Sequence, residues 1–181
     1  MKGGAHWLVG SAALAACVLL VAPRTAAAQE SIIIVRHAER QTGDGDDPLS
    51  EAGRHRAERL ATTLKDAGVT HIFVTDRRRT LETAQPLARL HHLQATPVAI
   101  PAGPRGALNP SELQVRATIA AMARLPRTAV VLVVGHSDTV PIFLRRLGYP
   151  PEITIPENEF DNLFIVTPRA SRPPAVVRLR F

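Results

Sequence analysis

The chain has 181 residues, of which 45% are hydrophobic and 21% are charged, and its mean hydropathy is +0.02. These values are typical of a globular protein and argue against wholesale disorder, a fibrous repeat or a multi-pass membrane protein. The formal net charge is +6, and all but two of the 22 cationic side chains are arginines. Guanidinium groups bind phosphate through a planar two-point fork, so small phosphorylated ligands fit this charge, as does a solvated basic surface. Nucleic acid fits less well, because aromatic residues for base stacking make up only 4% of the chain.

Residues 1–28 have the three parts of a secretory signal peptide. A lysine lies near the start, an apolar run extends from Trp7 to Ala22, and small residues end at Ala28. The run is shorter than the roughly 20 residues that span a bilayer. We therefore expect cleavage after Ala28 and a periplasmic or secreted domain formed by residues 29–181, without stable membrane association. The alternative is a lipoprotein, because the segment that ends in Cys17 resembles a bacterial lipobox.

The expected domain opens with a strand, a loop and a helix. Residues 31–35 are a short run of β-branched side chains, which predicts a buried strand of a parallel sheet. The Gly- and Asp-rich residues 41–48 predict a loop. Ser50 can cap a helix that extends to about residue 66 and stops at Gly68.

The alternation of strands and helices continues to the end of the chain. Further strands are predicted at residues 71–75, 98–100, 128–134, 163–167 and 175–180, and further helices at residues 79–90, 111–125 and 139–147. Pro86 is expected to interrupt the first of these helices, and Asn109 with Pro110 begins the second. This order predicts a single α/β domain whose central sheet is mostly parallel and is flanked by helices on both faces.

Charged residues follow three of the predicted strands. Arg36-His37, the segment 76–79 and Gly135-His136 each come directly after a strand, and ligands of such sheets bind outside the carboxyl ends of the strands. Two histidines and two arginines gathered there would form a pocket for a phosphate dianion. One histidine can attack phosphorus as a neutral imidazole, while the other groups neutralise the oxygens of the transition state.

Four short motifs in order carry a family resemblance. Residues 36–39, Arg-His-Ala-Glu, resemble the Arg-His-Gly/Ala motif that opens the histidine phosphatase superfamily, to which the cofactor-dependent phosphoglycerate mutases and many small phosphatases belong. Residues 48–54 resemble its P-L-T/S-x-x-G-R segment, residues 79–84 its R-x-x-x-T-A helix start, and residues 135–137 the surroundings of its second catalytic histidine. The resemblance extends over the expected domain and implies a phosphoglycerate mutase-like fold.

The resemblance also implies roles for individual residues. His37 would be the nucleophile that becomes phosphohistidine, and Arg36, Arg79 and His136 would bind the phosphoryl group. Water would then discharge the intermediate, so the resemblance implies no metal and no cofactor. His91 and His92 do not change this expectation, because adjacent helical positions point in different directions and no third ligand accompanies them.

The general acid that protonates the leaving oxygen has several candidates. Asp138 lies two residues beyond His136 and could deliver a proton from the same loop, so we place it first. Small relatives often carry Asn at the matching position, and acid phosphatase relatives carry Asp one residue earlier, so Asp138 departs from both patterns. The alternatives are Glu39, Glu82 and Glu112.

The other charged residues near these motifs have structural explanations. We expect Arg54 to tether a loop or helix, and Arg77 and Arg78 to be exposed to solvent. Arg40 could reach the rim of the phosphate pocket, although we expect it too to be exposed. The acidic segment 157–162 is either a solvated turn or a border of the pocket that repels some substrates.

The function that follows is hydrolysis of phosphate monoesters through a phosphohistidine at His37, with a small phosphorylated substrate. One alternative is a phosphoglycerate mutase-type phosphotransferase, which would not need an export leader and for whose substrate lid the segment 84–128 is short. Another is a binding module that holds a phosphorylated ligand without turnover.

Overall fold

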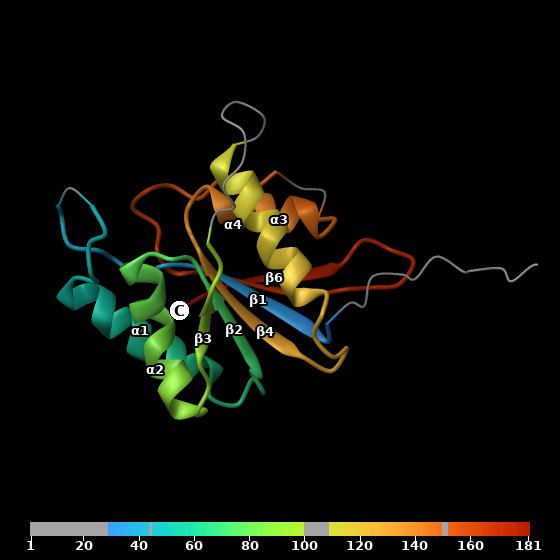
Figure 1. The fold of residues 1–181 in the computed structure, drawn as a ribbon, viewed down its shortest axis with the longest axis horizontal. Coiled ribbons are helices and arrows are strands. Elements are labelled where there is room, and N and C mark those ends of the chain that lie inside the picture. Colours follow the sequence, from blue (N-terminus) through green and yellow to red (C-terminus); the bar gives the residue numbers. More distant parts are fainter. Residues whose placement is uncertain (1–28, 44, 100–108, 150–151) are drawn as a thin grey trace, which may run out of the picture.

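A computed structural model describes residues 29–43, 45–99, 109–149 and 152–181 of the chain (Figure 1). The predicted signal peptide and Cys17 lie outside the described residues, so the expected cleavage and the alternative lipid anchor stay predictions. Within the described ranges, no helix is long and apolar enough to cross a bilayer.

The centre of the fold is a sheet of six strands, counted over the described residues, in the order β3-β2-β4-β1-β5-β6. Its strands are β1 (Ser31–Arg36), β2 (His71–Val74), β3 (Ala95–Pro97), β4 (Val130–Gly135), β5 (Asn162–Thr167) and β6 (Ala175–Arg180). The pairs β1–β4, β2–β4 and β2–β3 are parallel, whereas β5 and β6 join antiparallel at one side. The prediction of a mostly parallel sheet is confirmed.

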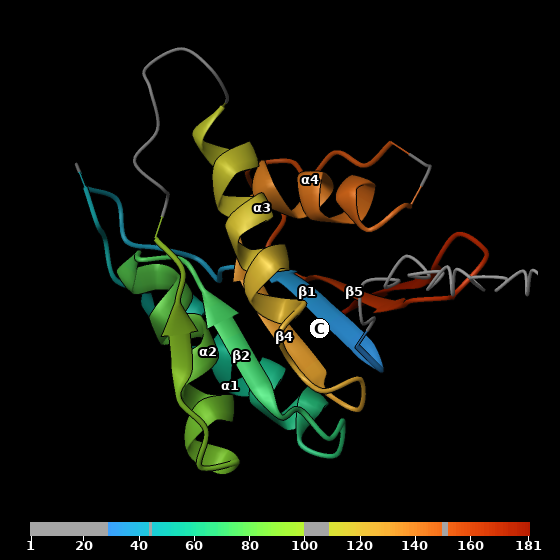
Figure 2. The same cartoon turned by 45° about the vertical axis from the view of Figure 1, so that its right-hand side comes forward.

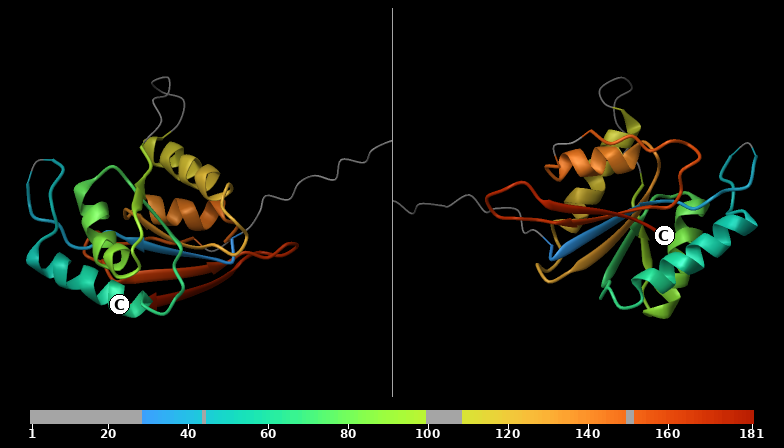
Figure 3. Two further views of the ribbon diagram at one scale, coloured as in Figure 1. Left: turned by 60° about the horizontal axis from the view of Figure 1, so that its bottom comes forward. Right: turned by 180° about the vertical axis from the view of Figure 1, so that it is seen from behind.

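Helices cover both faces of the sheet, as predicted (Figures 1, 2 and 3). The helices are α1 (Glu51–Leu64), α2 (Arg78–Leu90), α3 (Pro110–Met122) and α4 (Thr139–Arg146). On one face, α1 and α2 pack over Ile33 and Val35 of β1; on the other face, α3 and α4 pack over Ile32 and Ile34. Successive side chains of a strand point to opposite faces. An unbroken apolar run is therefore what a strand needs when both of its faces are covered.

The predicted helix starts are confirmed at the two caps. The side chain of Ser50 accepts a hydrogen bond from the amide of Gly53, and the side chain of Asn109 accepts one from the amide of Ser111. Pro110 occupies the first turn of α3, where its missing N–H has no helical partner to lose.

Two local predictions are wrong. Helix α2 continues through Pro86, because the buried side chains of Ala84 and Leu87 hold it against the core while the proline removes a single backbone hydrogen bond. The third strand lies at Ala95–Pro97 and ends before the region near residues 98–100 where it was expected, of which residue 100 lies outside the described residues. Its position is set by pairing with β2, which ends at Val74 opposite Pro97, and a proline is tolerated because β3 is an edge strand.

Candidate active site

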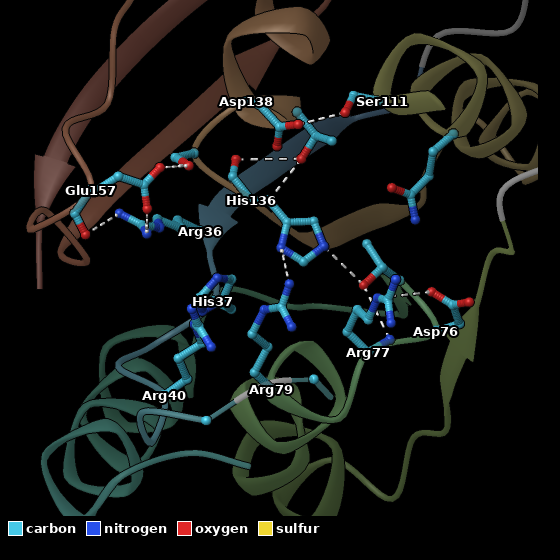
Figure 4. A pocket seen from close by; sticks show the side chains of 16 residues that line it. Arg36, His37, Arg40, Asp76, Arg77, Arg79, Ser111, His136, Asp138 and Glu157 are labelled. Atoms are coloured by element: carbon cyan, nitrogen blue, oxygen red, sulfur yellow. Dashed lines mark hydrogen bonds and ion pairs between the residues drawn. The ribbon is translucent and has the colours of Figure 1, made fainter. Parts of the chain in front are cut away.

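A pocket of about 600 Å³ lies at the carboxyl ends of β1, β2 and β4 (Figure 4). The structure brings five of the predicted site residues together in its lining: Arg36, His37, Arg79, His136 and Asp138. The three alternative acids, Glu39, Glu82 and Glu112, do not line it.

Strand register explains why the two histidines meet. Arg36 at the end of β1 pairs with Gly135 at the end of the parallel neighbour β4. The amide of His37 donates to the carbonyl of Gly135 at 2.9 Å, and the imidazole centroids of His37 and His136 are 5.2 Å apart. Both rings therefore extend from the same edge of the sheet.

His37 is held as a neutral imidazole with one nitrogen free. Its Nδ1 lies 2.7 Å from the carbonyl oxygen of Ala38, which can only accept, so Nδ1 carries the proton and Nε2 keeps its lone pair. Burial lowers the pKa of His37 to about 3, and the nearby His136, Arg79 and Arg36 add to this shift, whereas the hydrogen bond to Ala38 opposes it. A free imidazole lone pair surrounded by cations has the properties of a nucleophile for an anionic substrate.

His136 has the opposite tautomer. Its Nδ1 lies 3.5 Å from Arg79 Nη2 and must accept, because a guanidinium group only donates. In a neutral ring the proton is then on Nε2, which donates to the hydroxyl of Thr75 at 3.1 Å. Burial lowers the pKa of His136 to about 4, with the charge of Arg79 as the next contribution. Thr139 fixes the loop by accepting a hydrogen bond from the amide of His136.

Arg36 is positioned by the segment that precedes β5. Its Nη1 donates to the carbonyls of Pro156, Glu157 and Glu159 at 2.9, 2.8 and 3.1 Å, and its Nη2 donates to Glu157 Oε2 at 2.7 Å. The guanidinium also lies 4.2 Å from the ring centroid of Phe160. Its buried Nε has no hydrogen-bond partner among the described residues. The Nε–Nη2 edge thus keeps free hydrogens, in the geometry that binds two oxygens of a phosphoryl group.

Arg79 provides a second cationic group from the first turn of α2. Its Nε is also buried and unpartnered within the described part of the chain. Burial lowers its pKa, and the neighbouring Arg40 and Arg77 lower it further, which reflects the clustering of arginines around the pocket. The N-termini of α2 and α4 begin beside the pocket, where the helix dipole favours a negative charge.

Of the four candidate acids, the structure places only Asp138 in the pocket. The hydroxyl of Ser111 donates to Asp138 Oδ2 at 2.5 Å and fixes the carboxyl group. The alternatives have structural partners elsewhere: Glu39 forms a forked ion pair with Arg56, and Glu82 accepts from the amide of Leu49 at 2.6 Å. Glu112 is buried and forms ion pairs with three arginines of α3 and α4.

The structure adds residues to the pocket that the sequence motifs do not identify. Glu157 lines the pocket between Arg36 and Ser137. It also lies in an exposed turn, so both interpretations of the acidic segment are confirmed. In the sequence, only the position of Glu157 in the acidic segment 157–162 pointed to the pocket. Arg40 and Arg77 are half exposed, as expected, yet also line the pocket. Outside it, Arg54 tethers the loop before α1 by donating to the carbonyl of Leu49 at 3.0 Å.

No group of three His, Cys, Asp or Glu side chains in the described ranges is arranged to hold a metal ion. The polar groups that converge on the pocket are instead mainly nitrogen donors, which suit an anion.

Comparison with known proteins gives a sequence match and a fold match. Residues 32–100 match the family model of the histidine phosphatase superfamily (branch 1). This region contains three of the four motifs, from Arg36-His37 to the start of α2.

A related sequence, the "Probable phosphoglycerate mutase GpmB" of Photorhabdus laumondii, is 36% identical over 66 residues. The aligned segment is 33% of this chain and 31% of that protein, so the chain matches about a third of the length of this relative.

Solved structures match over most of the chain. The mycobacterial glucosyl-3-phosphoglycerate phosphatase has a TM-score of 0.60 at 14% identity, covering 84% of this chain and 96% of that one. The product of the open reading frame Rv3214 from Mycobacterium tuberculosis has a TM-score of 0.59 at 18% identity, covering 84% and 97%. At these identities the likeness shows the fold. The family-model match shows that residues 32–100 of the chain are similar to the histidine phosphatase superfamily.

Proposed function

We propose that the protein is a phosphatase that hydrolyses small phosphate monoesters through a phosphohistidine at His37. The observation that carries this proposal is the state of His37: a buried imidazole whose Nδ1–H is engaged by Ala38 and whose Nε2 lone pair is free beside Arg36 and Arg79. Such a nitrogen attacks phosphorus without first losing a proton.

In the first step, Nε2 of His37 forms a bond to phosphorus as the ester P–O bond breaks. The leaving oxygen takes a proton from the carboxyl group of Asp138, which Ser111 orients. The buried Nε–H groups of Arg36 and Arg79, which have no partner among the described residues, would donate to the equatorial oxygens and stabilise their charge in the transition state.

In the second step, water attacks the phosphorus of the phosphohistidine and the P–N bond breaks. Asp138, now a carboxylate, accepts a proton from this water, and the imidazole of His37 leaves with its Nε2 lone pair restored. The products are the free alcohol and inorganic phosphate. Asp138 donates a proton in the first step and regains one in the second, so the enzyme returns to its starting state.

A phosphoglycerate mutase activity is the second candidate, because the related GpmB sequences carry that name. The first step would be shared, and the phosphoryl group would pass to a hydroxyl of the substrate rather than to water. Interconversion of 2- and 3-phosphoglycerate, faster than release of phosphate from either, would select this candidate.

The proposal is tested with p-nitrophenyl phosphate in the presence of EDTA. Wild type should turn over under these conditions, His37→Ala should lose activity by at least about 10³-fold, and His55→Ala, an exposed histidine of α1, should match wild type. Rapid quenching at alkaline pH should show one acid-labile phosphoryl group on a peptide that contains His37. A folded wild type with no turnover, or an unlabelled His37, would contradict the proposal and favour a binding module.

We also propose that the enzyme acts in the periplasm or outside the cell, since residues 1–28 have the pattern of an export leader. The intact mass of protein recovered from the periplasmic fraction should correspond to a chain that begins at Gln29. A lipid-modified chain that begins at Cys17 would support the lipoprotein alternative, and a full-length cytoplasmic chain would refute both.

A further inference from the structure

Glu157 is a carboxylate held at the mouth of the pocket. Its Oε2 lies 2.7 Å from Arg36 Nη2, and its Oε1 accepts a hydrogen bond from the hydroxyl of Ser137 at 2.6 Å. The Arg36 side chain is 4% exposed, whereas that of Glu157 is 84% exposed. The carboxylate is therefore fixed by two partners and still faces whatever enters the pocket (Figure 4).

The charges of the pocket disfavour a substrate that carries a second anionic group besides its phosphate. In the described lining, four arginines face the carboxyl groups of Asp76, Asp138 and Glu157. Under the proposed function Asp138 is protonated when the substrate binds, so two carboxylates remain. The two histidines are neutral above about pH 5, because their pKa values are lowered to about 3 and 4. A single phosphate dianion already matches the two positive charges that remain. A second anionic group on the substrate would thus enter a site without a free cation to match it.

The leaving group lies on the acidic side of this pocket. Under the proposed function, the leaving oxygen receives its proton from Asp138 and must therefore be close to that carboxyl group. Asp138 directly follows Ser137, the residue that holds Glu157. Asp138 and Glu157 border the pocket on one side of His136, and Asp76 and Arg77 border it on the other (Figure 4). A substituent on a leaving oxygen beside Asp138 would therefore have Glu157 on its own side of the pocket.

We propose that Glu157 is a specificity-determining residue, which selects phosphate monoesters whose leaving group carries an ammonium group and rejects those whose leaving group carries a carboxylate or a second phosphate. This inference rests on the proposed function and names the substrate class of the same pocket. A fixed carboxylate favours the cation by direct attraction and disfavours the anion by repulsion, so it discriminates in both directions.

The test compares two esters of equal chain length, O-phosphoethanolamine and 2-phosphoglycolate. We expect wild type to have the higher kcat/KM for the cationic ester, and Glu157→Gln to lower the ratio of the two kcat/KM values by about fivefold, as for one charge pair in a partly screened site. Differences in leaving-group reactivity cancel when the ratio of the variant is compared with that of wild type. Any general effect on the position of Arg36 cancels too, since glutamine retains one carbonyl oxygen that accepts from Arg36, and its amide group can donate to the hydroxyl oxygen of Ser137.

Glu152→Gln is the matched control, because Glu152 is an exposed glutamate that precedes Glu157 in the chain and does not line the pocket. It should leave the ratio unchanged. Added salt should reduce the discrimination of wild type and should affect Glu157→Gln less, because exposed charges are screened. A ratio that is equal in wild type and Glu157→Gln, or a preference of wild type for 2-phosphoglycolate, would overturn the assignment.

Binding separates this inference from the proposed function. In a His37→Ala background, which cannot form the phosphoenzyme, calorimetry gives the Kd of each intact ester with and without Glu157→Gln. A shift of the Kd ratio without turnover by wild type would contradict the phosphatase proposal and keep Glu157 as a selector. Turnover by wild type together with an unchanged Kd ratio would support the phosphatase proposal and contradict the role of Glu157 as a selector.

Discussion

The imidazole rings of His37 and His136 face each other edge to face, with centroids 5.2 Å apart and an interplanar angle of 66°. Each ring follows one member of the register pair Arg36–Gly135 at the ends of adjacent parallel strands. Two protonated imidazoles at this distance would repel each other and the arginines around them. The arrangement consequently favours the neutral form of both rings, and this has consequences for stability.

Acid should destabilise the protein through His37. Because its pKa falls from 6.5 to about 3 on folding, the unfolded chain binds a proton between pH 6.5 and pH 3 that the folded chain does not. Stability is therefore present above pH 6.5 and is lost as the pH falls, by about 2 kcal/mol between pH 7 and pH 5. Urea unfolding at both pH values measures this loss, and His37→Gln should show a smaller one. Equal losses in the two proteins would contradict the pKa shift.

Asp138→Asn should separate substrates by the basicity of their leaving groups. p-Nitrophenolate departs without protonation, so its rate of release should change less than about tenfold, whereas an alkyl phosphate should slow by about 10²- to 10³-fold. Steady-state kinetics on a series of aryl and alkyl phosphates checks this expectation. Equal losses across the series would remove Asp138 from the role of acid, and Ser111→Ala should show a milder form of the same trend because it releases the carboxyl group.

Glu112→Gln should affect stability rather than catalysis. Glu112 is 8% exposed and joins α3 to α4 through ion pairs with Arg116, Arg145 and Arg146. Loss of its charge leaves three arginines to repel one another, at a cost of about 1–2 kcal/mol in the free energy of unfolding. Denaturant titration measures this cost. The kcat of the folded variant should equal that of wild type, and a loss of kcat confined to poor leaving groups would instead make Glu112 the acid.

Glu58→Gln is the control for that experiment. Glu58 is an exposed glutamate of α1 with one long ion pair, to Arg89 at 3.7 Å. Such surface pairs contribute little, so the change in unfolding free energy should stay below about 0.5 kcal/mol.

Gly53→Ala should strongly destabilise the domain. A Cβ at this position of α1 would lie 2.0 Å from the backbone carbonyl oxygen of Glu39, which also accepts the amide of Ser50. Relief of the clash requires the backbone to move, and we expect a loss of more than about 3 kcal/mol. Thermal unfolding provides the measurement, with Gly45→Ala as the control because its Cβ would meet no atom within 4 Å. A similar melting temperature for both variants would show that the loop yields easily.

The close approach at Gly53 also gives a physical meaning to one of the sequence motifs. The segment 48–54 resembles a family pattern in which this glycine is followed by arginine. In the structure, the glycine lets α1 pack against the backbone just after His37, and Arg54 ties the loop back to Leu49. The motif does not line the pocket and thus supports the loop that carries His37.

The sequence by itself determined the elements and the composition of the cationic cluster. Its β-branched runs, helix caps and alternation of strand and helix are local signals. Burial of apolar side chains on both faces of the sheet then favours one arrangement of these elements, a sheet between two layers of helices. Because parallel strands present their carboxyl ends at one edge, Arg36, His37 and His136 could be placed together before their distances were known.

Only the tertiary structure decided which carboxylates reach that edge. Asp138, Glu39, Glu82 and Glu112 were all compatible with the sequence, and the structure gives the last three partners outside the pocket. It also brings Glu157, which is far from Arg36 along the chain, to 2.7 Å from its guanidinium. The reason is physical: periodicity and capping act within a few residues, whereas the partner of a charged side chain is set by strand order, register and the path of loops. None of these leaves a local pattern in the sequence.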